Sequence, residues 1–352
     1  MVIAMVVNIG LGIGIIFKST AALWSFHDMD VFAFDKTGTL TEGKMRVLEA
    51  NLLDPQVSPL IAALVADQNH PISKAISAHI ECAPDVLSHI KQGLSEVVIH
   101  PGKGLESNFA GFALLGGSAE YAQAELRPDQ EGDAASSVFY VTLGGLTVAR
   151  FALQDMERPD AKELVQLLQT AGKRVVMISG DIPGPVEQLA ASIGLAPSDV
   201  NSRCSPAGKL DIIRNLQTSG ARICYVGDGA NDAAALAAAD ISIAIGGGAD
   251  LAQATADLTI ASDRRLKDSI MCALALARLA RWHIKAGFAW SIFYNVFAVL
   301  LASGAFVKVR IAPRWAGLGE LASLLPIFAA AFGTRITWKV LLKTAVPAGR
   351  QG

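Results

Sequence analysis

The stretch VFAFDKTGTLTEG, residues 31–43, joins a short apolar run to a polar loop. The run VFAF has the length and composition of a strand buried on both faces of a parallel sheet. Asp35 follows it directly, and two threonines and a glycine come next. A structural explanation is a turn, because Asp, Thr and Gly are typical of turns. A chemical explanation is a nucleophilic carboxylate, because open α/β sheets bind their ligands at the carboxyl ends of the strands.

The apolar residues of the chain are concentrated near its two ends. Hydrophobic residues make up 52% of the 352 positions, and charged residues make up only 18%. Residues 1–18 lack a basic leader and a cleavage site, which favours the end of a transmembrane helix over a signal peptide. Residues 286–307 and 315–334 are two further apolar runs of membrane-spanning length. We therefore expect a soluble middle region flanked by transmembrane helices.

Charge and cysteine content exclude several classes of protein. The formal net charge is −2 and there is no dense basic run, so we expect no nucleic-acid partner. The four cysteines are scattered, without the spacing of a zinc site. Reduced thiols in a cytoplasmic compartment are the simplest interpretation.

The middle of the chain alternates short apolar strands with helices. The strands RVVMIS, RICYV and ISIAI each precede a glycine-rich or acidic turn. This alternation predicts a doubly wound parallel α/β sheet, formed by residues 19–46 and 151–262. Residues 47–150 contain two helices and several hairpin-like strands, which indicates a separate α+β insert.

Polar side chains follow three of the predicted strands. Parallel strands end at one edge of a sheet, so we expect several carboxylates and an amide to meet there. Carboxylates gathered in one crevice repel one another, and Mg²⁺ relieves the repulsion because it prefers oxygen ligands. Lys209 could neutralise the charge of a transferring phosphate. The residues concerned are Asp35, Ser179, Gly180, Asp181, Asp228, Asn231 and Asp232.

Four motifs in this order resemble the phosphorylation domain of P-type ATPases: DKTGTLTEG, SGD, PAGK and GDGANDAAAL. The resemblance implies a haloacid-dehalogenase-like Rossmann fold that forms an aspartyl-phosphate. It implies Asp35 as the nucleophile, and Asp155, Arg158 and Pro159 match a DxxRP stretch of the family. The catalytic residues implied are Asp35, Lys36, Thr37, Ser179, Gly180, Asp181, Lys209 and Asn231. The Mg²⁺ ligands implied are Asp35, Thr37, Asp228 and Asp232.

Thr37 distinguishes this chain from soluble phosphatases of the same fold. Those enzymes carry a second Asp two positions after the nucleophile, where it acts as a general acid and base. Thr37 cannot transfer a proton in this way, so we expect slow hydrolysis of the acyl-phosphate. A persistent intermediate suits a pump.

The insert resembles the nucleotide-binding domain of the heavy-metal subgroup of these pumps. NHPISKAI is similar to its His-Pro motif, and PGKG is similar to its Gly-x-Gly loop. The resemblance implies that ATP binds with His70 and Pro71 near the adenine, and with Gly102 and Gly104 at the nucleotide. Taken alone, His70 would more often be a helix-start or core histidine. Val65 stands where the family often has Glu.

The C-terminal runs resemble the last membrane helices of the subgroup. Tyr294 and Asn295 match its YN pair, and Glu320 and Ser323 stand where copper members carry Met and Ser. The resemblance implies that these four residues contact the transported cation. Two interpretations of Glu320 stay open, because an intramembrane carboxylate is a functional candidate but could also pair with Arg314 at the interface.

The resemblance covers nearly the whole chain, but only the C-terminal half of a pump. We expect ATP-dependent phosphorylation of Asp35, coupled in the full pump to export of a transition-metal cation, with copper the first choice. The expected location is the plasma (inner) membrane, in contact with the lipid bilayer, with the catalytic domains in the cytoplasm. An N-terminal half carrying the actuator domain would be the partner, and this chain alone would not transport metal. Alternatives are a truncated regulatory protein, a membrane-anchored phosphatase of the haloacid dehalogenase type and a potassium-pump subunit.

Overall fold

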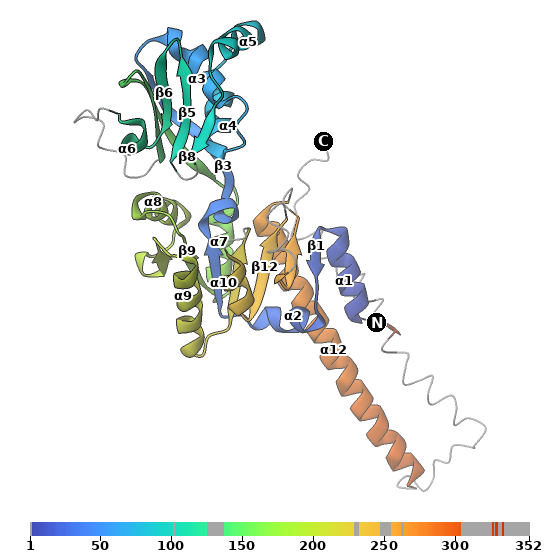
Figure 1. The fold of residues 1–352 in the computed structure, drawn as a ribbon. Helices are drawn as coiled ribbons and strands as arrows, with labels where there is room; N and C mark the ends of the chain where they lie inside the picture. The colour runs from blue at the N-terminus through green and yellow to red at the C-terminus, as the bar shows by residue number, and fades with distance from the viewer. Residues whose placement is uncertain are drawn as a thin grey trace. The chain divides into compact units, whose positions relative to one another are not determined.

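The described residues form two β-sheets, and the chain divides into two compact units (Figure 1). The computed structural model describes residues 2–100, 103–124, 137–228, 232–246, 255–261, 264–303, 326, 328, 329 and 333. One unit comprises residues 1–32, 172–174 and 210–352, and the other comprises residues 33–171 and 175–209.

The seven-stranded sheet is the predicted doubly wound sheet. Its order is β1-β13-β12-β11-β2-β9-β10. Adjacent strands β11 and β12, β12 and β13, and β9 and β10 are parallel, whereas β1 pairs antiparallel with β13. The predicted fold class is therefore confirmed. The strand bounds are β1 Ile15–Phe17, β2 Val31–Asp35, β9 Arg174–Ile178, β10 Val200–Asn201, β11 Ile223–Gly227, β12 Ile241–Ile245 and β13 Leu258–Ile260.

The central strands are apolar because both of their faces are covered. Every residue of β2, β11 and β12 is buried, as expected of strands that lie between two layers of helices. Asp35 is the last residue of β2, Ser179 follows β9, and Asp228 follows β11. The functional candidates thus stand where each strand ends.

The helices of this part of the fold have buried faces and end residues typical of amphipathic helices. α7 buries Ala161, Leu164, Val165 and Leu168, which is one face of a helix. α8 begins at Pro183 and ends before Gly194, whose φ of +82° favours glycine. The helix bounds are α2 Thr20–Ser25, α7 Ala161–Thr170, α8 Pro183–Ile193, α9 Pro206–Thr218 and α10 Ala233–Ala238.

The six-stranded sheet is antiparallel, in the order β3-β8-β7-β6-β5-β4. Burial alternates along β5, as expected of a sheet with one face on a core. That core contains Leu64, Ile76, Leu114 and Phe151. The strand bounds are β3 Thr41–Leu52, β4 Val98–His100, β5 Gly104–Phe109, β6 Phe112–Gly117, β7 Ser137–Leu143 and β8 Leu146–Glu157. The helix bounds are α3 Ser58–Val65, α4 Pro71–His79, α5 Pro84–Gly93 and α6 Ala119–Ala122.

The predicted limits of the insert, residues 47 and 150, fall inside two long strands. β3 and β8 pair from Thr41 opposite Glu157 to Leu52 opposite Ala149, with two irregularities. The hydrogen-bonded ladder continues through both limits, so a change in composition does not mark an end of either strand. A two-stranded ribbon therefore joins the insert to the phosphorylation loop.

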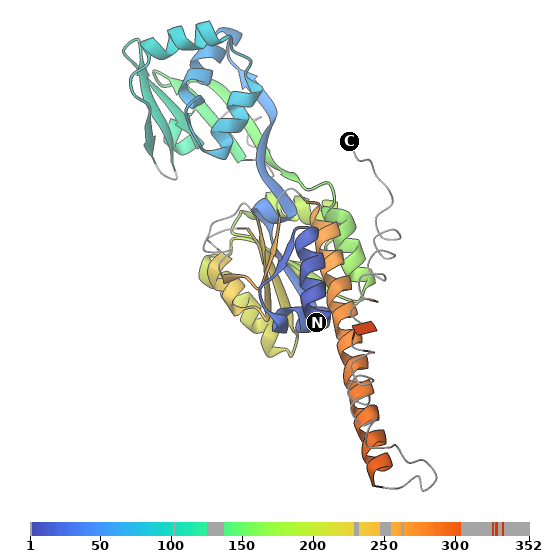
Figure 2. The same ribbon diagram turned by 90° about the vertical axis from the view of Figure 1, so that its right-hand side faces the viewer.

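The prediction of a helix over residues 1–18 is wrong for its last part. The helix α1 covers Val2–Gly12, and Ile15–Phe17 then forms the edge strand β1. An apolar segment of this length is compatible with a membrane helix or with a buried strand. Here the segment is a strand because it pairs with β13. Figures 1 and 2 show α1 alongside the beginning of α12, the helix Leu266–Ala302, and the two are in contact.

The helix α12 begins 20 residues before the predicted membrane segment 286–307. Its first part packs on the protein and buries Leu266, Ile270 and Leu276. Arg281 pairs with Asp28 and lies over the ring of Trp24, with 5.4 Å between the guanidinium carbon and the ring centroid.

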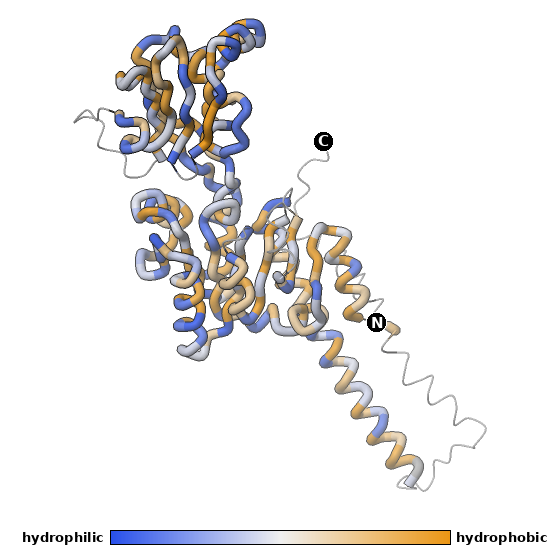
Figure 3. Tube along the Cα trace, in the orientation of Figure 1, coloured by the Kyte–Doolittle hydropathy of each residue, from blue (hydrophilic) through white to orange (hydrophobic). Residues whose placement is uncertain are grey.

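After Arg281, α12 carries several exposed apolar residues, including Phe288, Ile292 and Phe293 (Figure 3). The helix is long and apolar enough to cross a membrane by length and composition. The predicted second segment, 315–334, lies outside the described residues, apart from four isolated positions.

Candidate active site

The phosphorylation-site candidate is a buried ion pair at the end of β2. Asp35 is only 6% exposed, and the Lys209 ammonium lies 2.5 Å from Asp35 Oδ1. Lys209 belongs to the first turn of α9, where its backbone N–H donates to the Ser205 carbonyl at 2.9 Å. Because both side chains are buried, this contact is screened little by solvent. The sequence placed Lys209 in this region, and the structure brings it to Asp35.

A second ion pair joins the phosphorylation loop to the SGD loop after β9. Lys36 is buried and its ammonium donates to the Asp181 carboxylate, which is about half exposed. Ser179 Oγ accepts the Asp181 N–H at 3.1 Å and so shapes this loop. A Cβ at Gly180 would lie 3.3 Å from the Cys204 carbonyl oxygen, so the loop packs closely there. Asp181 thus faces a lysine.

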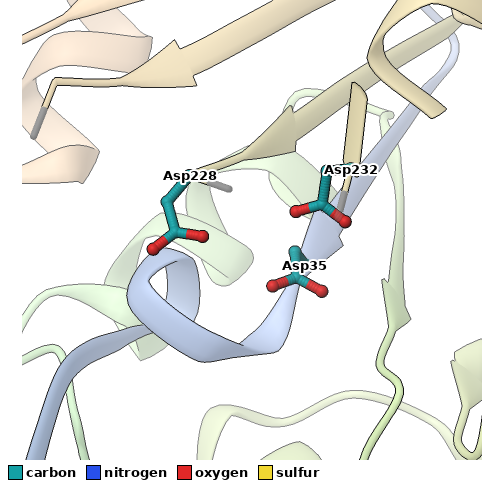
Figure 4. Close-up of side chains that lie close together, drawn as sticks. All are labelled: Asp35, Asp228 and Asp232. Atoms are coloured by element: carbon teal, nitrogen blue, oxygen red, sulfur yellow. The ribbon is translucent and has the colours of Figure 1, made fainter. Parts of the chain in front are cut away.

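Three of the predicted carboxylates form an acidic cluster. Figure 4 shows the side chains of Asp35, Asp228 and Asp232 close together, and one oxygen of each lies within 4.8 Å of the others. Asp232 is buried and accepts the Tyr225 hydroxyl at 2.9 Å. A Cβ at residue 227 would lie 2.8 Å from Asp232 Oδ2, so glycine is needed there. Asn231 lies outside the described residues.

The donor set of this cluster fits a hard divalent cation. Carboxylates at this separation repel one another, and Mg²⁺ takes oxygen ligands and retains positions for phosphate oxygens. The predicted Mg²⁺ ligands Asp35, Asp228 and Asp232 supply such oxygens.

The loop after Asp35 is held from the return strand β8. Thr41 Oγ1 lies in hydrogen-bond contact with the Asp155 carboxylate, and Gly38 donates its N–H to Thr41 at 3.1 Å. Arg158 donates to the Thr39 carbonyl at 2.8 Å and to the Gly38 carbonyl at 2.9 Å. Burial raises the pKa of Asp155, and the hydrogen bond from Thr41 acts in the opposite direction. Asp155 and Arg158 of the DxxRP stretch therefore hold the phosphorylation loop in place.

A cavity of about 850 Å³ lies within the second unit, beside the phosphorylation loop. Its lining includes Lys36, Thr37 and Asp181, and also His70 and Pro71 of the insert. His70 Nδ1 accepts the Ile72 N–H at 3.3 Å, so this residue caps α4 as well as lining the cavity. The cavity is large enough for a small-molecule ligand.

Gly104, the described glycine of the predicted nucleotide loop, does not line this cavity. It lies in β5, where a Cβ would approach the Gly116 carbonyl oxygen to 2.1 Å and the Tyr121 ring to 2.7 Å. Gly102 falls outside the described ranges. Close packing is thus a sufficient reason for glycine at position 104.

A family model described as haloacid dehalogenase-like hydrolase matches residues 29–240, and a second model with the same description matches residues 208–274. The first match covers more than half of the chain. The chain belongs to the haloacid dehalogenase-like hydrolases.

This hydrolase is similar to curated metal-transporting ATPases. It is 33% identical to the probable copper-transporting ATPase SynA of Synechococcus elongatus, over 89% of this chain and 40% of that protein. It is 28% identical to the copper-transporting ATPase HMA4 of Oryza sativa subsp. japonica, over 97% of this chain and 36% of that protein. The chain therefore spans well under half the length of these relatives.

Solved structures give the same relationship. A zinc-transporting PIB-type ATPase in the E2.Pi state aligns with a TM-score of 0.71 and 26% identity, over 95% of this chain and 54% of that chain. The catalytic domain of the CPx-ATPase CopB-B aligns with a TM-score of 0.60 and 26% identity, over 77% of this chain and 98% of that chain. The resemblance to heavy-metal P-type ATPases is confirmed.

The candidate residues for a transported cation are less fully placed in this hydrolase. Tyr294 and Asn295 lie on the exposed part of α12, and Asn295 is 3.4 Å from the Ser291 hydroxyl oxygen. Glu320 and Ser323 lie outside the described residues. The cation site stays a prediction.

Two residues that contact the candidate groups were not predicted from the sequence. The Tyr225 hydroxyl donates to Asp232, but a tyrosine inside the apolar strand RICYV is expected to be an ordinary core residue. Thr41 bonds the phosphorylation loop to Asp155, and its signal was the third threonine of DKTGTLT. The sequence pattern does not show which hydroxyl group bonds to a candidate carboxylate, because the two partners of the Thr41 contact are far apart in the sequence.

Proposed function

We propose that this chain is the catalytic portion of a heavy-metal cation-transporting P-type ATPase. ATP phosphorylates Asp35, and the full pump couples this reaction to export of a transition-metal cation, with copper the first choice. The chain lies in the plasma (inner) membrane through its apolar helices, and its catalytic domains face the cytoplasm. The copper-transporting relatives support the choice of metal.

The observation that carries the proposal is the arrangement around Asp35. Its carboxylate lies 2.5 Å from the Lys209 ammonium, and within 4.8 Å of an oxygen of Asp228 and of Asp232. A buried carboxylate beside a cation and a potential metal site is equipped to attack an anionic phosphate, which otherwise would be repelled.

In the proposed reaction, an Asp35 carboxylate oxygen attacks the γ-phosphorus of ATP. The bond between that phosphorus and its bridging oxygen breaks, and ADP leaves with the bond's electron pair. Lys209 offsets charge on the transferring phosphoryl group, and Ser179 donates a hydrogen bond to its oxygens. Mg²⁺ bound by Asp35, Asp228 and Asp232, with Thr37 near it, would neutralise the charge shared by the carboxylates and the phosphate.

Thr37 supports a pump rather than a phosphatase. Thr37 lines the cavity but carries no group that exchanges a proton near neutral pH. Water therefore lacks a general base at this position, and the acyl-phosphate of Asp35 persists.

The test is incubation of the purified chain with Mg²⁺ and γ-labelled ATP, followed by acid quenching. We expect label that survives acid and is released by hydroxylamine, as an acyl-phosphate requires. A membrane-anchored phosphatase would turn over without accumulating label. A regulatory protein without activity would acquire no label, and either result would exclude the proposal.

A further inference from the structure

The Thr41 hydroxyl contacts the loop between Asp35 and β3 at two points. Thr41 is 1% exposed, and its Oγ1 lies 3.0 Å from the Lys36 carbonyl oxygen and 3.1 Å from the Gly38 nitrogen. The same oxygen contacts the Asp155 carboxylate across the β3–β8 ribbon. Thr41 thus joins the backbone on either side of Thr37 to a side chain that is 114 positions away.

Other contacts fix the backbone of the later part of this loop. Arg158 holds the Gly38 and Thr39 carbonyls, and its own N–H donates to the Leu40 carbonyl at 2.9 Å. Gly38 has a φ of +71°, which favours glycine and fixes the turn. Arg158 therefore fixes the later half of the loop, while Thr41 contacts the Lys36 carbonyl through both its backbone N–H and its hydroxyl.

The hydroxyl of Thr41 has one proton but two acceptors. It accepts from Gly38, and it can donate either to Lys36 or to Asp155. A protonated Asp155 would donate to Thr41, which leaves the hydroxyl proton for the Lys36 carbonyl. Asp155 Oδ1 is buried, and the carboxyl group contacts Thr41 through Oδ2.

The groups around Asp155 shift its pKa in both directions. Burial raises the pKa of Asp155, and the nearby carboxylate of Asp181 raises it further. The Lys36 ammonium, the Thr41 hydroxyl and a backbone hydrogen bond involving Lys44 act in the opposite direction. Burial is the largest of these effects.

We propose that Asp155 is a positioning residue for Asp35 that acts through the Thr41 hydroxyl. It fixes the Lys36 carbonyl, and with it the peptide that joins the nucleophile to Thr37. Asp155 itself touches no reacting atom in this scheme. The inference rests on the proposed phosphorylation of Asp35, but the loop contact can be tested without it.

The chain offers a matched control two positions away. Thr39 is 0% exposed and in the same loop, and its Oγ1 has no hydrogen-bond partner among the described residues. Thr41→Val and Thr39→Val remove the same group from two equally buried sites. Thr41→Ser keeps the hydroxyl and serves as the conservative rescue.

The first measurement is amide hydrogen exchange of the peptide covering residues 36–41, without nucleotide. Thr41→Val should speed exchange in this peptide, because the Gly38 N–H loses its acceptor, while Thr39→Val and Thr41→Ser should match the wild type. Equal exchange in the two valine variants would overturn the proposed contact. The exchange measurement tests the loop contact even if the wild type forms no phosphoenzyme. Absence of the phosphoenzyme would contradict only the proposed function.

The second measurement is the rate of phosphoenzyme formation at saturating Mg²⁺–ATP. Thr41→Val and Asp155→Ala should each slow it by about 10- to 100-fold, since small displacements of reacting groups have effects of this size. The rate of phosphoenzyme formation by Thr39→Val should match that of the wild type. The double variant should be no slower than the single ones. Losses that multiply in the double variant, or a Thr41→Val rate equal to that of Thr39→Val, would refute action through Thr41.

Discussion

The two sheets of this chain are built in different ways and carry different parts of the candidate chemistry. The central strands β2, β11 and β12 of the seven-stranded sheet are buried on both faces, and β2 ends directly at Asp35. In the six-stranded sheet, by contrast, burial alternates along β5 between a core face and an exposed face. Groups at the end of a buried strand are held by many neighbours, whereas groups on the insert, such as His70, are exposed.

The difference is also visible in the ion pairs. In the Lys209–Asp35 pair the side chains are 8% and 9% exposed, whereas in the Lys91–Asp67 pair of the insert they are 34% and 76% exposed. Buried pairs interact strongly but are costly to break, while exposed pairs contribute little. We therefore expect substitutions at the end of the seven-stranded sheet to change the rate of the chemical step. Substitutions on the insert should change ATP binding or have no effect on the reaction.

The largest effect is expected for Asp35→Asn. An amide is not a nucleophile, so the phosphoenzyme should be absent rather than reduced. Asp85→Asn, which changes an exposed aspartate in the first turn of α5, is the control and should label like the wild type. Label that persists in Asp35→Asn would mean that another residue is modified.

A smaller but still large effect is expected for Lys209→Met. Removal of one preorganised charged donor typically costs about 10² to 10³ in rate, and phosphoenzyme formation should slow by that factor. The measurement is a rapid-quench time course at saturating Mg²⁺–ATP. A rate within the error of the wild type would show that the ion pair with Asp35 is structural only.

A moderate effect is expected for His70→Ala, and on binding rather than chemistry. His70 lines the cavity, so the KM for ATP should rise about tenfold, equivalent to about 1.4 kcal/mol. The rate at saturating ATP should not change. His89→Ala, at an exposed position of α5, is the control. A lower saturating rate with an unchanged KM would assign His70 to the chemical step.

The smallest effect is expected for Lys91→Met. Its partner Asp67 is exposed, so the free energy of unfolding should change by less than about 1 kcal/mol. Phosphoenzyme formation should match the wild type. Urea unfolding of the two proteins gives the comparison, and a loss of several kcal/mol would show that the exposed pair contributes as a buried one does.

Much of the parallel sheet could be predicted from the sequence. VFAF, RVVMIS, RICYV and ISIAI are short, predominantly apolar segments, and all four form strands of one sheet. The proximity of Asp35, Asp228 and Lys209 followed from their places beside those strands. Local patterns suffice here because strand burial, turn residues and catalytic motifs occupy contiguous segments.

Other features depend on contacts that a local pattern does not encode. GLESNF forms β5 although it contains Glu, Ser and Asn, because β4 and β6 pair with it on both sides. IIF forms an edge strand rather than the end of a membrane helix, because β13 offers a partner. The bond between Thr41 and Asp155 joins distant segments, so it became visible only in the folded chain.

The most direct test of the central claim is to locate the phosphoryl group. The chain is incubated with Mg²⁺–ATP, quenched in acid and reduced with borohydride, which converts an aspartyl-phosphate to homoserine. Peptide mass spectrometry then identifies the modified position. We predict homoserine at position 35 and at no other aspartate. Homoserine elsewhere, or an unmodified Asp35 in a preparation that hydrolyses ATP, would contradict the account.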